Sequence, residues 1–152
     1  MLEVKEVLEK GIAKLAVRRG IHSDLQNIQE ITDRISQAAG KNENISDVTV
    51  ELYRALAEST HKCAFVQLMG RIIPLIVSKG KGISLSPKEK LRMHIGVEDY
   101  LHKGDEGSMV KWIEEHLAYM RKKFLEYYRG TGKIGLGRQN LLAKIWGLWV
   151  GV

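Results

Sequence analysis

The stretch HIGVEDYLHKGDEGSMVKWIEEHL, residues 94–117, predicts two helices joined by a short turn. The turn is the Lys-Gly-Asp sequence at 103–105, and the Asp105 carboxylate can cap the helix that follows. His94 and His116 each lie roughly ten residues from this turn, or about 15 Å at 1.5 Å of rise per residue. We therefore expect the two imidazoles at one level of a helical bundle, forming either a metal or anion site or a pair of buried histidines bonded to their neighbours.

Helical periodicity extends over most of the remaining chain. The first helix carries an apolar stripe at three- and four-residue spacing, formed by Val4, Leu8, Ile12, Leu15 and Ala16. Similar stripes span residues 25–35 and 48–56. We expect a helix from Pro87 to about Lys103, and a long helix from Asp105 to roughly Tyr128. The predicted fold class is all-α, an antiparallel bundle of six to seven helices.

Residues 63–77, CAFVQLMGRIIPLIV, are the most continuously apolar stretch of the chain. They predict a central helix that is buried on most sides, with Pro74 kinking or weakening its last turns. Cys63 is the only cysteine, so it cannot form an internal disulfide. We expect Cys63 to be a small buried apolar residue in a protein of the reducing cytoplasm.

The charge distribution argues against specific binding of nucleic acid. The chain has 152 residues and a formal net charge of +6, from 24 basic and 18 acidic residues. Seven of the basic residues but only one acidic residue lie in 117–152, so the other 17 of each sign cancel. The N-terminus lacks a signal peptide, and no apolar run reaches the roughly 18 residues that span a bilayer. We expect a cytoplasmic protein that does not bind a membrane.

No motif in the chain predicts an enzyme. Gly130, Gly132 and Gly135 spell GxGxxG, but they follow a predicted helix rather than a strand, which is the wrong context for a dinucleotide site. We interpret residues 130–152 as a glycine-rich connector and an apolar C-terminal helix that contains tryptophan. Its apolar face, formed by Leu142, Ile145, Trp146 and Trp149, is expected to dock against protein.

Several stretches resemble one known family. Residues 2–20, LEVKEVLEKGIAKLAVRRG, are similar to the first helix of the FCD domain, the C-terminal effector domain of FadR-type GntR transcription regulators. LYRALAEST at 52–60 resembles another segment of that domain, and residues 94–117 match a third with both histidines and the Gly-Asp turn in register. The resemblance covers roughly residues 2–128, so we treat residues 1–129 as an FCD-type domain for effector binding and dimerisation.

The resemblance implies a sensor rather than a complete regulator. It predicts a homodimer that binds a small, carboxylate-like organic acid in a central pocket. It assigns DNA recognition to a winged helix-turn-helix domain that the sequence lacks, so this chain alone should not bind nucleic acid specifically. The alternative is a stand-alone module for ligand binding or protein interaction.

The family's site residues match this sequence only in part. Many members bind a divalent metal through an Asp, a His four residues later and two further histidines. In this sequence Thr49 stands at the Asp position and Tyr53 at the first His position, and His94 and His116 match the two further histidines. Lys5 replaces an arginine that often holds the ligand's carboxylate, which keeps the charge but loses the bidentate fork. We expect an effector pocket formed by Lys5, Thr49, Tyr53, His94 and His116. Zn, Ni or Mn would retain only His94 and His116, and two ligands are few for tight binding.

Overall fold

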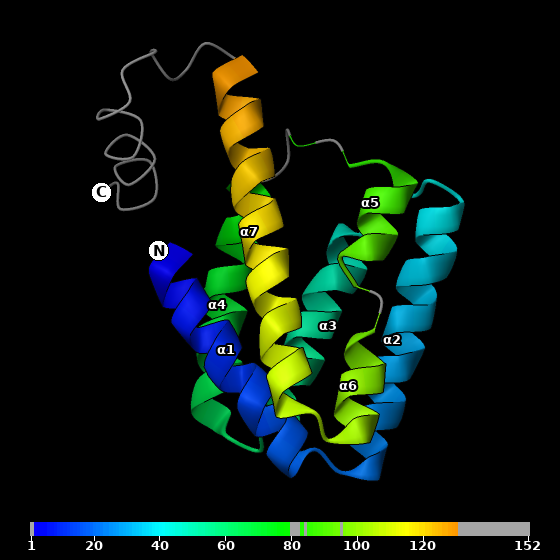
Figure 1. Ribbon diagram of the computed structural model, residues 1–152, viewed down its shortest axis with the longest axis vertical. Helices are drawn as coiled ribbons and strands as arrows, with labels where there is room; N and C mark the ends of the chain where they lie inside the picture. Colours follow the sequence, from blue (N-terminus) through cyan, green and yellow to red (C-terminus); the bar gives the residue numbers. More distant parts are fainter. Residues whose placement is uncertain (1, 80–82, 84, 95, 131–152) are drawn as a thin grey trace.

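The computed structural model describes residues 2–79, 83, 85–94 and 96–130, and within them the helix is the only regular secondary structure (Figure 1). The predicted all-α class is therefore confirmed. The helices are α1 (Leu2–Arg19), α2 (His22–Gly40), α3 (Ser46–Glu58), α4 (Cys63–Lys79), α5 (Pro87–Arg92), α6 (Val97–Lys103) and α7 (Glu106–Gly130). The predicted connector and tryptophan helix of residues 130–152 lie, apart from Gly130, outside the described residues.

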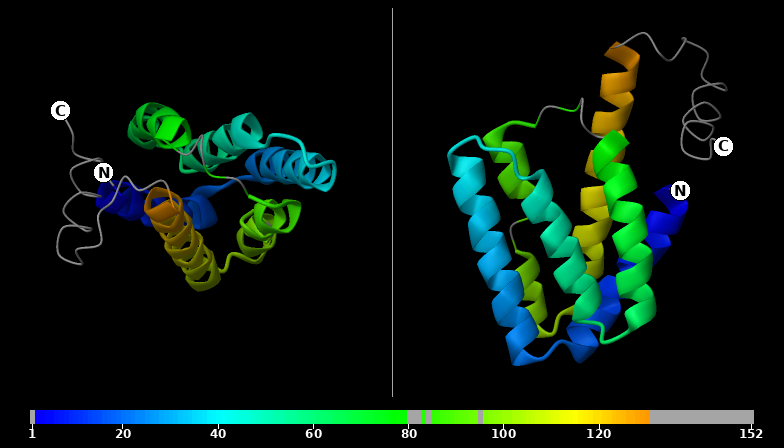
Figure 2. Two further views of the ribbon diagram at one scale, coloured as in Figure 1. Left: turned by 90° about the horizontal axis from the view of Figure 1, so that it is seen from above. Right: turned by 180° about the vertical axis from the view of Figure 1, so that it is seen from behind.

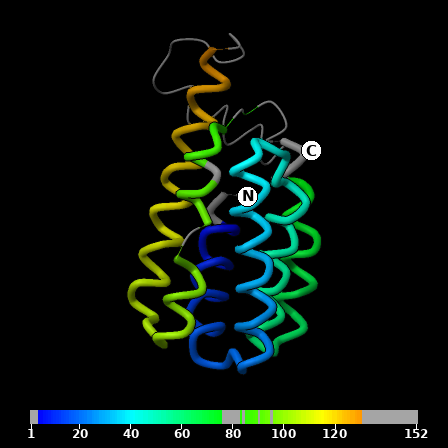
Figure 3. Tube along the Cα trace, turned by 90° about the vertical axis from the view of Figure 1, so that its right-hand side faces the viewer, coloured from blue at the N-terminus to red at the C-terminus, as the bar shows by residue number. Residues whose placement is uncertain are grey.

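The helices form a bundle of two layers. The long helices α1 to α4, which follow one another along the chain, run in alternating directions (Figure 1). Seen from above, α4, α3 and α2 form one row, while α7 and the α5–α6 segment lie opposite with α1 beside α7 (Figure 2). The contacts agree, since α3 packs between α2 and α4, and α7 packs on α1 and α6. The side view separates the same two layers (Figure 3). Large apolar side chains from both layers fill the space between them: Ile28, Ile35, Leu52, Leu56, Met69, Val97, Met109 and Ile113.

The buried face of α1 agrees with the predicted stripe only in part. Ile12 and Ala16 are buried as predicted, but Val4 is exposed, Leu8 and Leu15 are half-buried, and Ala13 is buried instead. At four-residue spacing this face continues toward the N-terminus through Glu9 and Lys5, both of which are buried. The apolar pattern was thus misleading because two charged residues occupy core positions.

Helix α4 is peripheral, contrary to the prediction of a central helix. Met69 and Ile73 are buried, but Leu68, Pro74 and Leu75 are exposed, and so is Cys63, which was predicted to be buried. The physical reason is its place at the end of a row, where α3 covers one side and α1 makes only a smaller contact. The helix continues through Pro74 to Lys79. None of the helices in the described part of the chain is long and apolar enough to cross a membrane.

The helix predicted from Pro87 to Lys103 is divided into α5 and α6. Gly96 has a backbone φ of 94°, a left-handed conformation that ends the helical path, and it becomes the N-cap of α6. His94 therefore lies in the turn between two short helices. The predicted cap of α7 is confirmed, because the backbone N–H of Ser108 donates to the Asp105 carboxylate at 2.9 Å.

The conformation of Gly96 predicts an effect of replacing it. In Gly96→Ala the new side chain would be forced into the left-handed region, which costs about 1–2 kcal/mol. The matched control is Gly11→Ala in the middle of α1, where the added Cβ would meet only the Phe65 ring at 3.8 Å. This control should stabilise the protein by about 0.5–1 kcal/mol because alanine favours helix. Urea unfolding followed by circular dichroism measures both, and equal effects would contradict the assigned backbone conformation.

A buried polar cluster as the candidate functional site

Five polar side chains from three helices and one turn are buried together between the layers. Lys5 and Glu9 come from α1, Tyr53 from α3, His116 from α7 and His94 from the turn after α5. None is more than 7% exposed. Lysine and glutamate are almost never fully buried unless they are paired, and burying such groups costs stability. This concentration of polar groups in a core makes the cluster the candidate functional site.

Tyr53 and His116 form the central hydrogen bond of the cluster. The Tyr53 hydroxyl lies 2.6 Å from Nε2 of His116. Burial, together with the negative charge of Glu9, raises the pKa of Tyr53 well above its ordinary value. Burial, with the positive charge of Lys5 and the proximity of His94, holds the pKa of His116 well below its ordinary value. Both rings are therefore neutral near pH 7, and we assign the Tyr53 hydroxyl as the donor and Nε2 as the acceptor.

The two histidines lie side by side, as a hairpin at residues 103–105 requires. The centroids of the His94 and His116 rings are 6.0 Å apart, with an angle of 65° between their planes. Trp112, one turn earlier on α7, stacks on His116 at 5.8 Å. The structure thus brings together four of the five side chains predicted for the pocket: Lys5, Tyr53, His94 and His116. Thr49 is half-buried one turn before Tyr53, and the contact that joins α3 to His116 is made by Tyr53.

Lys5 and Glu9 form an ion pair inside the bundle. The Lys5 ammonium lies 2.6 Å from Oε1 of Glu9, one helical turn away, and 5.3 Å from the centroid of the Tyr53 ring. Burial raises the pKa of Glu9, and the charge of Lys5 partly opposes this rise. Glu9 was not predicted from the sequence. The available signal was its position four residues after Lys5 and in line with the buried Ile12, Ala13 and Ala16.

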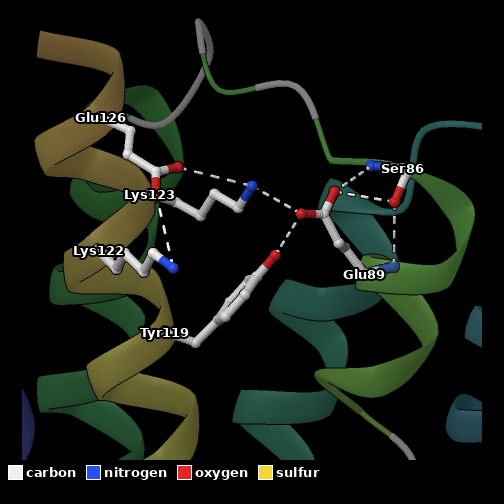
Figure 4. Close-up of polar contacts among 6 residues, drawn as sticks. All are labelled: Ser86, Glu89, Tyr119, Lys122, Lys123 and Glu126. Carbon is white, nitrogen blue, oxygen red and sulfur yellow. Dashed lines mark hydrogen bonds and ion pairs between the residues drawn. The ribbon is translucent and has the colours of Figure 1, made fainter. Parts of the chain in front are cut away.

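A second polar cluster fixes α5, which precedes His94, to α7, which carries His116 (Figure 4). One carboxylate oxygen of Glu89 accepts from the Tyr119 hydroxyl and pairs with the Lys123 ammonium at 2.6 Å. The other oxygen accepts from the backbone N–H and the hydroxyl of Ser86, each at 2.8 Å. Lys123 above all, with Tyr119 and Ser86, lowers the pKa of Glu89. The carboxylate therefore stays charged near neutral pH and holds the two histidine-bearing segments together.

A comparison with known protein families identifies the domain. The model of the FCD domain family matches residues 1–120. The chain belongs to the FCD domain family. No curated protein matches the sequence. FCD domains are effector-binding regions of GntR-type transcription regulators and are generally not enzymes, so the match agrees with the resemblance found in residues 2–128.

The metal site of many FCD domains does not fit the residues present in this one. Within the described residues, no three His, Cys, Asp or Glu side chains lie close enough together to hold a metal ion. Tyr53 stands where those domains have a histidine ligand, and its hydroxyl is hydrogen-bonded to Nε2 of His116. A neutral phenol and the neutral Thr49 are poor replacements for an imidazole and a carboxylate.

Replacing two residues should convert this site into a metal site. The double variant Thr49→Asp/Tyr53→His supplies an imidazole beside His116 and a carboxylate one helical turn before it, so that with His94 the site has four ligands of the type that zinc prefers. Added Zn²⁺ should then raise the melting temperature of the double variant by several degrees, because a metal that binds only the folded state stabilises it. A thermal-shift titration measures this, with untreated and chelator-treated wild type as controls. An equal response of the wild type would show that its site already binds metal, and no response of the variant would contradict the placement of Thr49 and Tyr53.

Proposed function

We propose that this FCD domain is the effector-binding and dimerisation domain of a GntR-type transcription regulator. The buried cluster of Lys5, Glu9, Tyr53, His94 and His116 would be its effector site. The observation that carries the proposal is the burial of a charged pair and two histidines in a core that could have been apolar. Burying such groups costs stability, and perturbed pKa values are common at functional sites.

The cluster suggests how binding would be transmitted. Two of its five side chains belong to α1, the helix that packs on α7. In regulators of this family the winged helix-turn-helix domain precedes the FCD domain, so α1 is the element nearest to it. An effector that contacts Lys5 or Glu9 would favour one position of α1 over another. In a complete regulator this would shift the population between two arrangements of the DNA-binding domains.

We further propose that the effector is bound without a metal ion. In metal-binding members the ion supplies the positive charge that attracts the ligand, whereas here the buried ammonium of Lys5 lies 5.3 Å from the centroid of the Tyr53 ring and its charge acts on His116. The stacked Trp112 and His116 rings offer an apolar surface, and the neutral His116 offers hydrogen bonding. A small metabolite with both polar and apolar parts fits these groups.

The effector site can be tested by ligand binding to matched histidine variants. Small organic acids and amino acids are screened by thermal shift, and native mass spectrometry identifies any small molecule that remains bound to the purified chain. At 100 times its Kd a ligand should raise the melting temperature by about 5–10 °C. His116→Leu should abolish this rise, whereas His102→Leu, at an exposed position on α6, should retain it. Retained binding in His116→Leu, or no ligand by either method, would contradict the proposed site.

The dimerisation surface that we propose lies on α4 and the adjoining part of α1. Four large apolar side chains are exposed on these two helices, which contact each other: Val4, Val7, Leu68 and Leu75. Val7 is 71% and Leu68 is 44% exposed. Helix α4 forms the near side of the molecule seen from behind (Figure 2, right). Ala64, one turn before Leu68, is also exposed, and its small side chain allows another helix to approach closely.

A charge placed on this surface should prevent dimerisation. Leu68→Asp would bury an unpaired carboxylate between the subunits, so the chain should elute as a monomer. Gln26→Asp, at an exposed position on α2, is the matched control and should leave the dimer intact. Size-exclusion chromatography with light scattering measures the mass of each. A wild-type monomer would contradict the proposal and would favour another occupant of the surface, and a dimeric Leu68→Asp would place the interface elsewhere.

A further inference from the structure

The proposed effector site contains a cation together with its own counter-ion. The Lys5 ammonium and the Glu9 carboxylate are 2.6 Å apart, and their side chains are 6% and 1% exposed. The pair is therefore neutral as a whole. A ligand with only a carboxylate would gain an attraction to Lys5 but would place its own charge near a second buried carboxylate. Because charges interact strongly where water is excluded, that repulsion would offset much of the gain.

Glu9 has unused capacity to accept hydrogen bonds. Its two oxygens are fully buried, and among the described residues neither accepts a hydrogen bond of ordinary geometry in addition to the ion pair with Lys5. A carboxylate has about four lone-pair positions, and a buried one normally has several of them satisfied. A ligand that brings an N–H donor would satisfy one or more of these positions, so the cost of burying Glu9 would be recovered on binding.

The surroundings of the pair add no further charge from Tyr53 or His116. Both side chains are neutral near pH 7, because burial shifts the pKa of each away from the charged form. The Tyr53 ring already lies 5.3 Å from one ammonium group, which shows that a cation is accommodated against its face. Among Lys5, Glu9, Tyr53 and His116, the charges that a ligand would meet are therefore those of Lys5 and Glu9.

We propose that the effector is a zwitterion, a small molecule whose carboxylate binds Lys5 and whose ammonium group binds Glu9. This inference rests on the proposed function and specifies its ligand class. A zwitterion exchanges one ion pair for two, and each buried charge keeps a partner of opposite sign. A simple carboxylate would leave the cluster with one excess negative charge, and a simple amine with one excess positive charge. Isolated charges in a core are among the most costly groups to bury.

The full 152-residue chain can be tested with ligands that differ only in charge. Alanine is compared with propionate, which lacks its ammonium group, and with ethylamine, which lacks its carboxylate. β-Alanine and γ-aminobutyrate are zwitterions with greater separation of the charges. At least one zwitterion should raise the melting temperature of the wild type more than propionate and ethylamine do. Equal or greater stabilisation by propionate would overturn the proposal. This result is the one expected if Glu9 carries a proton, because the site would then be cationic.

Removing the charge of Glu9 should reverse the preference. Glu9→Gln keeps the shape of the side chain but leaves Lys5 without its counter-ion, so propionate should bind at least ten times more tightly than it does to the wild type. The zwitterion that stabilises the wild type most should lose its advantage over propionate in the same variant. Lys5→Met/Glu9→Leu replaces both charges by apolar side chains, so it covers the case in which Glu9→Gln fails to fold. It should bind that zwitterion no better than propionate, and an unchanged ratio in either folded variant would overturn the proposal.

The outcome also separates this inference from the proposed function. A co-purified or screened ligand that requires His116 but carries no ammonium group would support the proposed effector site and contradict the zwitterion as its ligand class. If no ligand of any charge requires His116, both the site and the ligand class are wrong.

Discussion

The hydrogen bond between Tyr53 and His116 connects the two layers of the bundle at their most polar point. It joins α3, in the row of α2, α3 and α4, to α7 in the opposite layer, at 2.6 Å. Because both partners are buried and neutral, the bond needs no counter-charge. Around it the bundle arranges the stacked Trp112, the adjoining His94 and the ion pair on α1. The same bond occupies the nitrogen that would otherwise be free to bind a metal, so one tyrosine determines both the packing and the chemistry of the site.

The charges of this core are distributed unevenly among the helices. Lys5 and Glu9 are adjacent on α1, while α3 and α7 contribute neutral groups. In the proposed effector site, electrostatic recognition would therefore depend on α1, and shape and hydrogen bonding would depend on the other helices. In the proposed sensor, the helix that would respond to the charge of a ligand would also be the helix that leads toward the DNA-binding domain in regulators of the FCD family.

Much of the fold followed from local sequence signals, but the exposure of its helices did not. The Lys-Gly-Asp turn and the cap at Asp105 correctly predicted the end of α6, the start of α7 and the proximity of the two histidines, because turn residues and helix caps act locally. The apolar composition of α4 suggested burial, yet whether an apolar helix is central depends on its position in the row. The break at Gly96 was missed because one glycine inside a helical pattern does not reveal its backbone angle. Glu9 was missed because periodicity counts apolar residues, and here two charged side chains occupy the core face.

The break between α5 and α6 gives the site a connection to the surface. A helix of six residues is too short to be stable by itself, so α5 depends on its cap at Ser86 and on the contacts of Glu89 with Tyr119 and Lys123. His94 follows directly after this helix and its C-cap. A surface change that weakens the Glu89 contacts would therefore alter the position of a buried histidine without touching it. Substitutions at the surface of α5 could therefore change the affinity of such a site while every residue of the core stays the same.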